Sequence, residues 1–123
     1  MGTGLGDGSS ARSDEFCYLT TSGRHTGRPH RIEIWFALHE GVVYLLSGGG
    51  ERSDWVRNLL ISPVVTLEIG DRKRTTKACV VTDPEEDALA RRSLVNKYEG
   101  RGEGDLSDWG RTALPIAIAW PEP

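Results

Sequence analysis

Residues 31–47 read RIEIWFALHEGVVYLLS and form two strand-like runs joined by the tight-turn pair Glu40-Gly41. In the first run every second residue from Ile32 to Leu38 is apolar, and this period of two predicts a half-buried strand. The second run, residues 42–47, is apolar on both faces and predicts a central strand. A link this short permits only antiparallel pairing, so the stretch predicts an antiparallel hairpin.

The rest of the chain continues this antiparallel pattern. We expect further strands at residues 16–21, 64–69, 73–82 and 112–120, and helices at residues 53–61 and 83–98. The order β-β-β-α-β-β-α-β lacks the long crossovers that a parallel sheet needs, and closing the sheet removes its exposed edges. A mainly β fold with two or three short helices is therefore expected, built as a closed or partly closed antiparallel barrel of about six strands.

Two sets of residues are assigned to the core from their position in these elements. Cys17 and Cys79 each lie in an apolar, strand-like run, where a cysteine usually behaves as a small buried hydrophobe. Their spacing matches neither a CxxC pair nor a metal-ligand pattern, so we expect no metal site. Trp55, Leu59 and Leu60 are expected to be the core-facing residues of the first helix.

Length, charge and composition limit the function further. The 123 residues suit one domain, residues 14–123, after a glycine-rich polar stretch over residues 1–13 that we expect to be a disordered tail. A formal net charge of −3 argues against a nucleic-acid binder. No run reaches the ~20 apolar residues of a membrane span, and the N-terminal stretch lacks the apolar core of a signal peptide, so a cytoplasmic protein is expected. Because so small a barrel has little core, we also expect a homodimer.

Two glycine-containing turns are candidates for binding an anion. Residues 20–31, TTSGRHTGRPHR, place three arginines and two histidines in one turn, and arginine forks match phosphate and carboxylate oxygens. Residues 47–55, SGGGERSDW, run from a glycine loop into a helix start, where free backbone N–H groups favour phosphate. A solvated basic turn and an ordinary capped loop are the alternative interpretations. Arg52 favours the anion site, since the positive end of the helix dipole would otherwise disfavour a cation there.

Sequence motifs of hydrolytic or metal-dependent enzymes are missing from the chain. There is no GxSxG, HExxH or Walker sequence, and the three histidines are scattered over turns and a strand end. What remains is binding, or chemistry carried out by a cofactor.

Two segments together resemble the deazaflavin-dependent nitroreductase and quinone reductase family of actinobacteria. They are YLTTSGRHTGRPHRIEIWF (residues 18–36) and VVYLLSGGGERSDWVRNLLISPVVTLEIG (residues 42–70). That family belongs to the flavin/deazaflavin oxidoreductases, so the resemblance implies a six-stranded antiparallel split β-barrel that binds the deazaflavin coenzyme F420. Carried over to this sequence, the cofactor contacts fall on Arg24, Arg28, Pro29, Arg31, Ser47, Gly48, Gly49, Gly50, Arg52, Ser53, Trp55 and Asn58. The sequence departs from the family pattern at His30 and Arg52, and its tyrosine-rich pocket segment is reduced to Tyr98 and Trp109.

The resemblance also implies the reaction. Reduced deazaflavin would donate a hydride to a small organic acceptor such as a quinone, nitroaromatic or enone, with the ring near residues 33–36 and the loop at residues 47–50. Tyr98 and Trp109 are the expected substrate-pocket residues, and residues 99–109 are expected to cover the pocket. The expected proton source is water, Ser47 or Tyr98. Two alternatives remain open: an FMN-binding split-barrel reductase or oxidase, and a non-catalytic F420 carrier.

Overall fold

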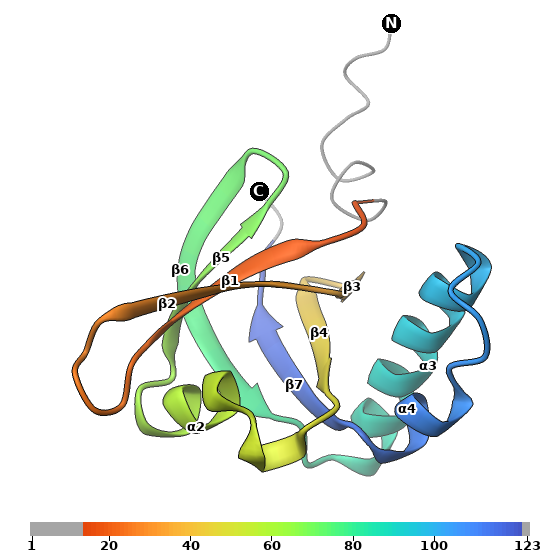
Figure 1. Cartoon of the computed structure of the whole chain (residues 1–123). Coiled ribbons are helices and arrows are strands. Elements are labelled where there is room, and N and C mark those ends of the chain that lie inside the picture. The colour runs from red at the N-terminus through yellow and green to blue at the C-terminus, as the bar shows by residue number, and fades with distance from the viewer. Residues whose placement is uncertain (1–13, 122–123) are drawn as a thin grey trace, which may run out of the picture.

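A computed structural model describes residues 14–121, so the tail expected at residues 1–13 lies outside the described residues. The described strands are β1 (Cys17–Ser22), β2 (Pro29–Ile34), β3 (Ala37–His39), β4 (Val42–Ser47), β5 (Val64–Ile69), β6 (Arg72–Val80) and β7 (Leu114–Ala119). The helices are a single 3₁₀ turn, η2 (Gly50–Arg52), and the α-helices α2 (Asp54–Ile61), α3 (Pro84–Gly100) and α4 (Ser107–Thr112) (Figure 1).

The strands form one curled antiparallel sheet in the order β2-β1-β5-β6-β7-β4-β3. Its two edge strands, β2 and β3, are consecutive in the chain and are separated only by Trp35 and Phe36. The chain itself therefore joins the two edges, as expected for a split barrel. The expected single strand over residues 31–38 is wrong in one respect, because its first half pairs with β1 and its second half with β4. The chain turns between these partners, which gives seven strands instead of six.

The interior of the curled sheet is filled by the inward faces of the strands. Cys17, Leu19, Leu67, Ile116 and Ile118 have no exposed surface and belong to one apolar cluster. The inward position expected for the alternating residues of 32–38 is confirmed, since they pack against or within the same cluster. The sheet thus encloses one core, and its outer faces remain for helices or solvent.

Two expected core assignments are wrong. Leu60 is 51% exposed, because Val56, Asn58 and Leu59 form the buried face of α2 and Leu60 lies beyond the edge of that face. Cys79 is exposed, because β6 alternates and its inward neighbour in this register is Ala78. Cys17 is buried as expected, and both cysteines are free.

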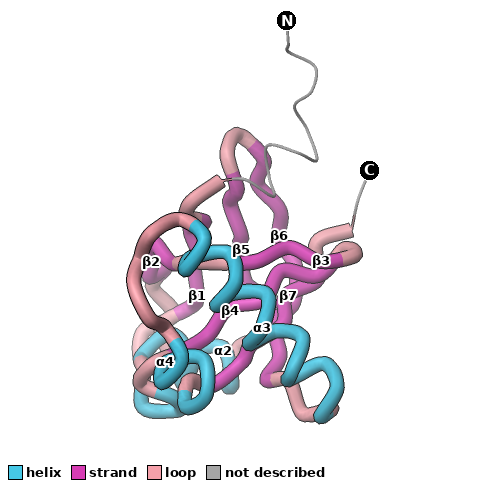
Figure 2. Tube along the Cα trace, turned by 90° about the vertical axis from the view of Figure 1, so that its right-hand side faces the viewer, coloured by secondary structure: helices cyan, strands magenta, loops and turns pink. Residues whose placement is uncertain are grey.

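Helix α3 covers the outer face of the sheet over β4 and β7, and α4 packs beside α3 (Figure 2). Asp83 caps α3 by accepting a hydrogen bond from the Glu86 N–H at 2.9 Å, which confirms the helix start expected there. Helix α4 lies in a segment expected to be a loop and strand start. So short a helix is not stable on its own, and here Trp109 and the buried Gly110 hold it against neighbouring elements. No helix within residues 14–121 is long and apolar enough to cross a membrane.

Candidate functional site

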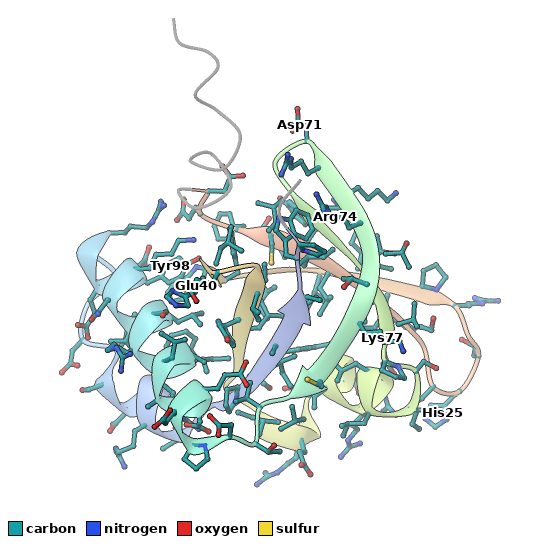
Figure 3. The ribbon with its side chains drawn as sticks, turned by 180° about the vertical axis from the view of Figure 1, so that it is seen from behind. His25, Glu40, Asp71, Arg74, Lys77 and Tyr98 are labelled. Carbon is teal, nitrogen blue, oxygen red and sulfur yellow. The ribbon has the colours of Figure 1, made fainter. Side chains whose placement is uncertain are left out.

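The first candidate site is a cleft of about 580 Å³ between the β1–β2 hairpin and α2, which we call the hairpin cleft. Figure 3 shows His25 on this hairpin, at the end of the molecule away from α3. The lining residues are Gly23, Arg24, His25, Thr26, Arg28, His30, Ile32, Asp54, Trp55 and Asn58. The cleft therefore combines basic groups from the turn with an aromatic and a polar side chain from the helix.

Arg24 and Asn58 fix the shape of the hairpin cleft. The Arg24 backbone N–H and guanidinium both donate to Asn58 Oδ1, at 3.1 and 2.9 Å, and the guanidinium also pairs with the Asp54 carboxylate at 3.0 Å. The Asn58 amide in turn donates to Thr21 Oγ1 at 3.1 Å. Asn58 is 3% exposed, and these bonds supply partners for both ends of its buried amide group. The network joins the hairpin to α2. Because Arg24 is ion-paired with Asp54, its charge is less available to a ligand.

Arg28 is the basic group of the hairpin cleft that remains available. Its side chain is exposed and makes no hydrogen bond or ion pair with residues 14–121. The turn that carries it needs two glycines: Gly27 has φ of 77°, and a Cβ on Gly23 would lie 2.7 Å from His30 Nε2. His30 therefore packs closely against Gly23, and it lines the cleft together with Arg28.

The loop after β4 is tied to the start of α2 by serine hydroxyls. Ser47 Oγ donates to the Gly50 carbonyl at 3.0 Å and lies 2.9 Å from Ser53 Oγ. Gly50 has φ of 61°, and a Cβ on Gly49 would lie 2.6 Å from Ser53 Oγ. Ser47 is only 2% exposed, so its hydroxyl shapes the loop and does not line a cleft.

The second candidate site is a cleft of about 520 Å³ at the corner between β2 and β3, which we call the tryptophan cleft. Trp35 stacks on Tyr98 with ring centroids 4.2 Å apart and planes at 7°, and Trp109 meets Trp35 edge-on at 5.6 Å. Gly48 lies next to Trp109, since a Cβ there would be 3.7 Å from Trp109 Cδ1. The lining residues are Phe16, Glu33, Ile34, Trp35, Leu46, Leu106 and Trp109. The cleft is therefore aromatic and apolar, with one carboxylate.

The two clefts follow one another along β2. Ile32 lines the hairpin cleft and Ile34 lines the tryptophan cleft, and both point to the same face of the strand. Two residues of a strand span about 7 Å. A long molecule lying along β2 could therefore place one end at the basic turn and the other end at the tryptophans.

Tyr98 requires a correction, because it lines neither cleft. It has no exposed surface and lies behind Trp35, where its hydroxyl accepts from the Phe36 N–H at 2.9 Å and donates to the Glu15 carbonyl at 2.7 Å. Burial raises the pKa of Tyr98 to about 12. On the same turn of α3, Lys97 Nζ donates to the Phe36 carbonyl at 2.9 Å, and burial lowers its pKa to about 8. Tyr98 and Lys97 thus anchor the β2–β3 corner.

The structure brings together some of the residues singled out from the sequence and leaves others apart. Arg24, Arg28, Trp55 and Asn58 line the hairpin cleft, and Trp109 lines the tryptophan cleft. Arg31 is on the outer face of β2, where it pairs with Glu68 at 3.1 Å and stacks over the Tyr18 ring. The other expected contacts are not among the lining residues of either cleft: Pro29, Ser47, Gly48, Gly49, Gly50, Arg52 and Ser53.

Sequence reasoning pointed to residues 33–36, to Trp109 and to the segment 99–109, and it missed Phe16 and Leu46 in the tryptophan cleft. Phe16 and Leu46 come from two distant segments, and nothing in their local pattern marks them. Trp35 carried a usable signal, because it shares the face of its strand with Arg31 and Glu33. A large aromatic residue on a face that should be polar indicates either a second packing layer or a ligand surface.

The curled seven-stranded sheet, split at the β2–β3 corner and carrying clefts along β2, defines a split-barrel protein. Similar folds occur in a conserved hypothetical protein from Mycobacterium tuberculosis (TM-score 0.75, 20% identity, 99% of this chain and 82% of that one). They also occur in an F420-H2 dependent reductase (TM-score 0.67, 17% identity, 85% of this chain and 93% of that one). An F420 reductase has the same fold (TM-score 0.63, 20% identity, 96% of this chain and 96% of that one). Residues 3–119 match the F420H(2)-dependent quinone reductase family, and the chain belongs to this family of enzymes.

Proposed function

We propose that this chain binds coenzyme F420 along β2 and transfers hydride from its reduced form to a quinone, nitroaromatic or enone. The observation that supports this is the succession of a basic cleft and an aromatic cleft along β2. F420 carries a phosphodiester and several carboxylates at one end and a flat ring at the other. The donor set of the hairpin cleft fits the acidic end, and the tryptophan cleft has room and aromatic surface for a flat acceptor.

In this proposal the hairpin cleft grips the acidic part of the cofactor. Arg28 supplies an uncommitted guanidinium, and His30 beside it adds a polar ring. Arg24 and Asn58 act by holding the hairpin on α2, so the cleft is formed before a ligand arrives. Arg52, on the single turn before α2, would add a second cation toward the tail. When bound, the reduced deazaflavin supplies the hydride.

The tryptophan cleft would hold the acceptor and keep its plane parallel to the hydride donor. Trp35 is held rigid by the Tyr98 ring behind it and Trp109 at its edge, so it offers a fixed flat wall. Positioning of this kind can supply about 7–11 kcal/mol in favourable cases. Because the Ser47 and Tyr98 hydroxyls are buried and bonded to the protein, we infer that water protonates the reduced acceptor.

A fluorescence titration of the purified protein with F420 and FMN, side by side, tests the cofactor assignment. We expect F420 to bind and FMN to bind more weakly. Replacing both Arg28 and Arg52 with alanine should raise the F420 dissociation constant at least tenfold, about 1.4 kcal/mol. The double variant Arg92→Ala, Lys73→Ala is the matched control, since it also removes two exposed positive charges and neither residue lines either cleft. Equal losses in the variant lacking Arg28 and Arg52 and in the control would contradict the assignment.

The alternatives make different predictions. An FMN-dependent reductase would bind FMN more tightly than F420 and reduce acceptors with it. A non-catalytic carrier would bind F420 tightly yet turn over no acceptor from a panel of quinones, nitroaromatics and enones.

We also propose that the protein is a cytoplasmic homodimer. Leu60, Ile61 and Val64 are 51%, 65% and 50% exposed where α2 meets β5, and such adjacent apolar residues favour a covered surface. Light scattering that gives the mass of one chain at micromolar concentration would contradict the dimer.

A further inference from the structure

We propose that Glu33 makes the tryptophan cleft select its acceptor by charge, favouring flat acceptors with a cationic or hydrogen-bond-donating substituent over anionic ones. The inference rests on the proposed function, since it concerns the acceptor that this cleft would hold. Glu33 is the only ionisable side chain among the residues that line the cleft within the described chain. The other lining residues are aliphatic or aromatic, so they contribute contact area without distinguishing one charge from another.

The Glu33 carboxylate is held at the edge of the cleft by a neighbouring strand. Tyr18 on β1 lies opposite Glu33 in the sheet register, and its hydroxyl donates to Glu33 Oε1 at 2.8 Å. This hydrogen bond raises the pKa of Tyr18, because the bonded carboxylate favours the protonated hydroxyl. The second oxygen, Oε2, has no partner among residues 14–121 and remains able to accept from an acceptor's substituent.

Arg31, on the same face of β2 as Glu33, is paired with another carboxylate. The Arg31 guanidinium donates to both Glu68 oxygens, at 3.1 and 3.3 Å, and stacks over the Tyr18 ring at 4.2 Å. Glu68 thus compensates Arg31, and the Glu33 charge has no direct ion pair with a described residue. Glu33 is exposed to solvent, so its effect on a bound molecule depends on direct contact with the free Oε2 and is screened by salt.

The test compares three 1,4-naphthoquinones: the neutral parent, one with a trimethylammonium-ended side chain and one with a sulfonate-ended side chain of equal length. Their kcat/KM values are measured with F420H2 for the wild-type protein and for Glu33→Gln. We expect the cation-to-anion ratio to fall at least fivefold in the variant, while the neutral quinone changes less than twofold. Comparing ratios between proteins cancels the different intrinsic reactivities of the quinones. Raising the salt concentration should lower the wild-type ratio.

Asp71→Asn is the matched control, because it changes the net charge equally but lies in the exposed β5–β6 turn (Figure 3). A second readout needs neither cofactor nor turnover: quenching of tryptophan fluorescence by the charged quinones in the protein alone. It is measured in a Trp55→Phe background, because Trp55 lines the hairpin cleft; Trp120 is buried, so the quenching then reports on Trp35 and Trp109. If no quinone is reduced but the cationic one still quenches at lower concentration and loses this preference in Glu33→Gln, the proposed function fails and the charge selection stands. If wild type and Glu33→Gln show the same cation-to-anion ratio in both readouts, the charge selection is wrong.

Discussion

Replacing Tyr98 with phenylalanine tests the arrangement on which the tryptophan cleft depends. The substitution removes one oxygen that lies fully buried between two backbone groups, the Phe36 N–H at 2.9 Å and the Glu15 carbonyl at 2.7 Å. The Phe36 N–H has no strand partner at the corner to replace it. Leaving such a buried donor unpaired costs about 1–3 kcal/mol, and the lost carbonyl bond adds to this, so we expect about 2–3 kcal/mol in total.

The expected loss is measurable by thermal and urea unfolding. For a domain of this length each kcal/mol lowers Tm by roughly 4 °C, so Tyr98→Phe should melt about 10 °C lower. Tyr18→Phe is the matched control: the same atom is removed at an exposed site, where the hydroxyl bonds only to Glu33, and Tm should change little. Equal Tm values for the two variants would refute the anchoring role of Tyr98.

The same variant separates anchoring from proton transfer. Loss of a general acid typically costs 10²- to 10⁴-fold in rate. Because the Tyr98 hydroxyl does not line a cleft and the phenyl ring can still stack on Trp35, we expect kcat to stay within about twofold well below Tm. A stable Tyr98→Phe protein with a 100-fold lower kcat would show that water is not the proton source.

Three further predictions concern stability. Gly110→Ala should cost about 1–3 kcal/mol by overpacking, because the new Cβ would lie 2.3 Å from Val95 Cγ2; an unchanged Tm would show that α4 shifts freely. Asp83→Ala removes the α3 cap that accepts from the Glu86 N–H, and urea unfolding should show a loss of about 1 kcal/mol, with Asp83→Ser keeping most of the stability. Burial lowers the Lys97 pKa from 10.5 to about 8, so above pH 8 the unfolded chain binds more protons at this residue than the folded protein does. The free energy of unfolding should therefore rise from pH 7.5 to 9. Lys97→Met should flatten this rise, and a Lys97→Met protein with the wild-type pH profile would contradict it.

The strand pattern was largely predictable, because the alternation of apolar and polar residues can be recognised within each strand's own sequence. The alternation from Ile32 to Leu38 and the turn at Glu40-Gly41 survive in the structure, with Glu40 and Gly41 both at positive φ. The break at Trp35 and Phe36 was not predictable. It depends on which strand each half pairs with and on a hydroxyl from α3, 62 residues further along the chain, that bonds to Phe36.

The candidate site was predictable in its chemistry and less so in its detailed arrangement. The basic hairpin and the helix after the glycine loop do meet, and Arg28 lines the resulting cleft. Arg24 is instead tied to Asp54 and Asn58, and Arg31 is tied to Glu68, because an ion pair between distant segments leaves no trace in either local sequence. Propensity alone also misses α4, since Trp109 and Gly110 are held by contacts with other elements.

The two clefts share β2 but are otherwise built from separate parts of the chain. The hairpin and α2 shape one, while Phe16, the end of β4 and residues 106–109 shape the other. In the proposed function, substitutions at Leu106 and Trp109 would therefore change which acceptors fit without altering the residues that hold the cofactor. A directed-evolution library confined to these two positions would then vary the acceptor and leave the cofactor-binding residues unchanged.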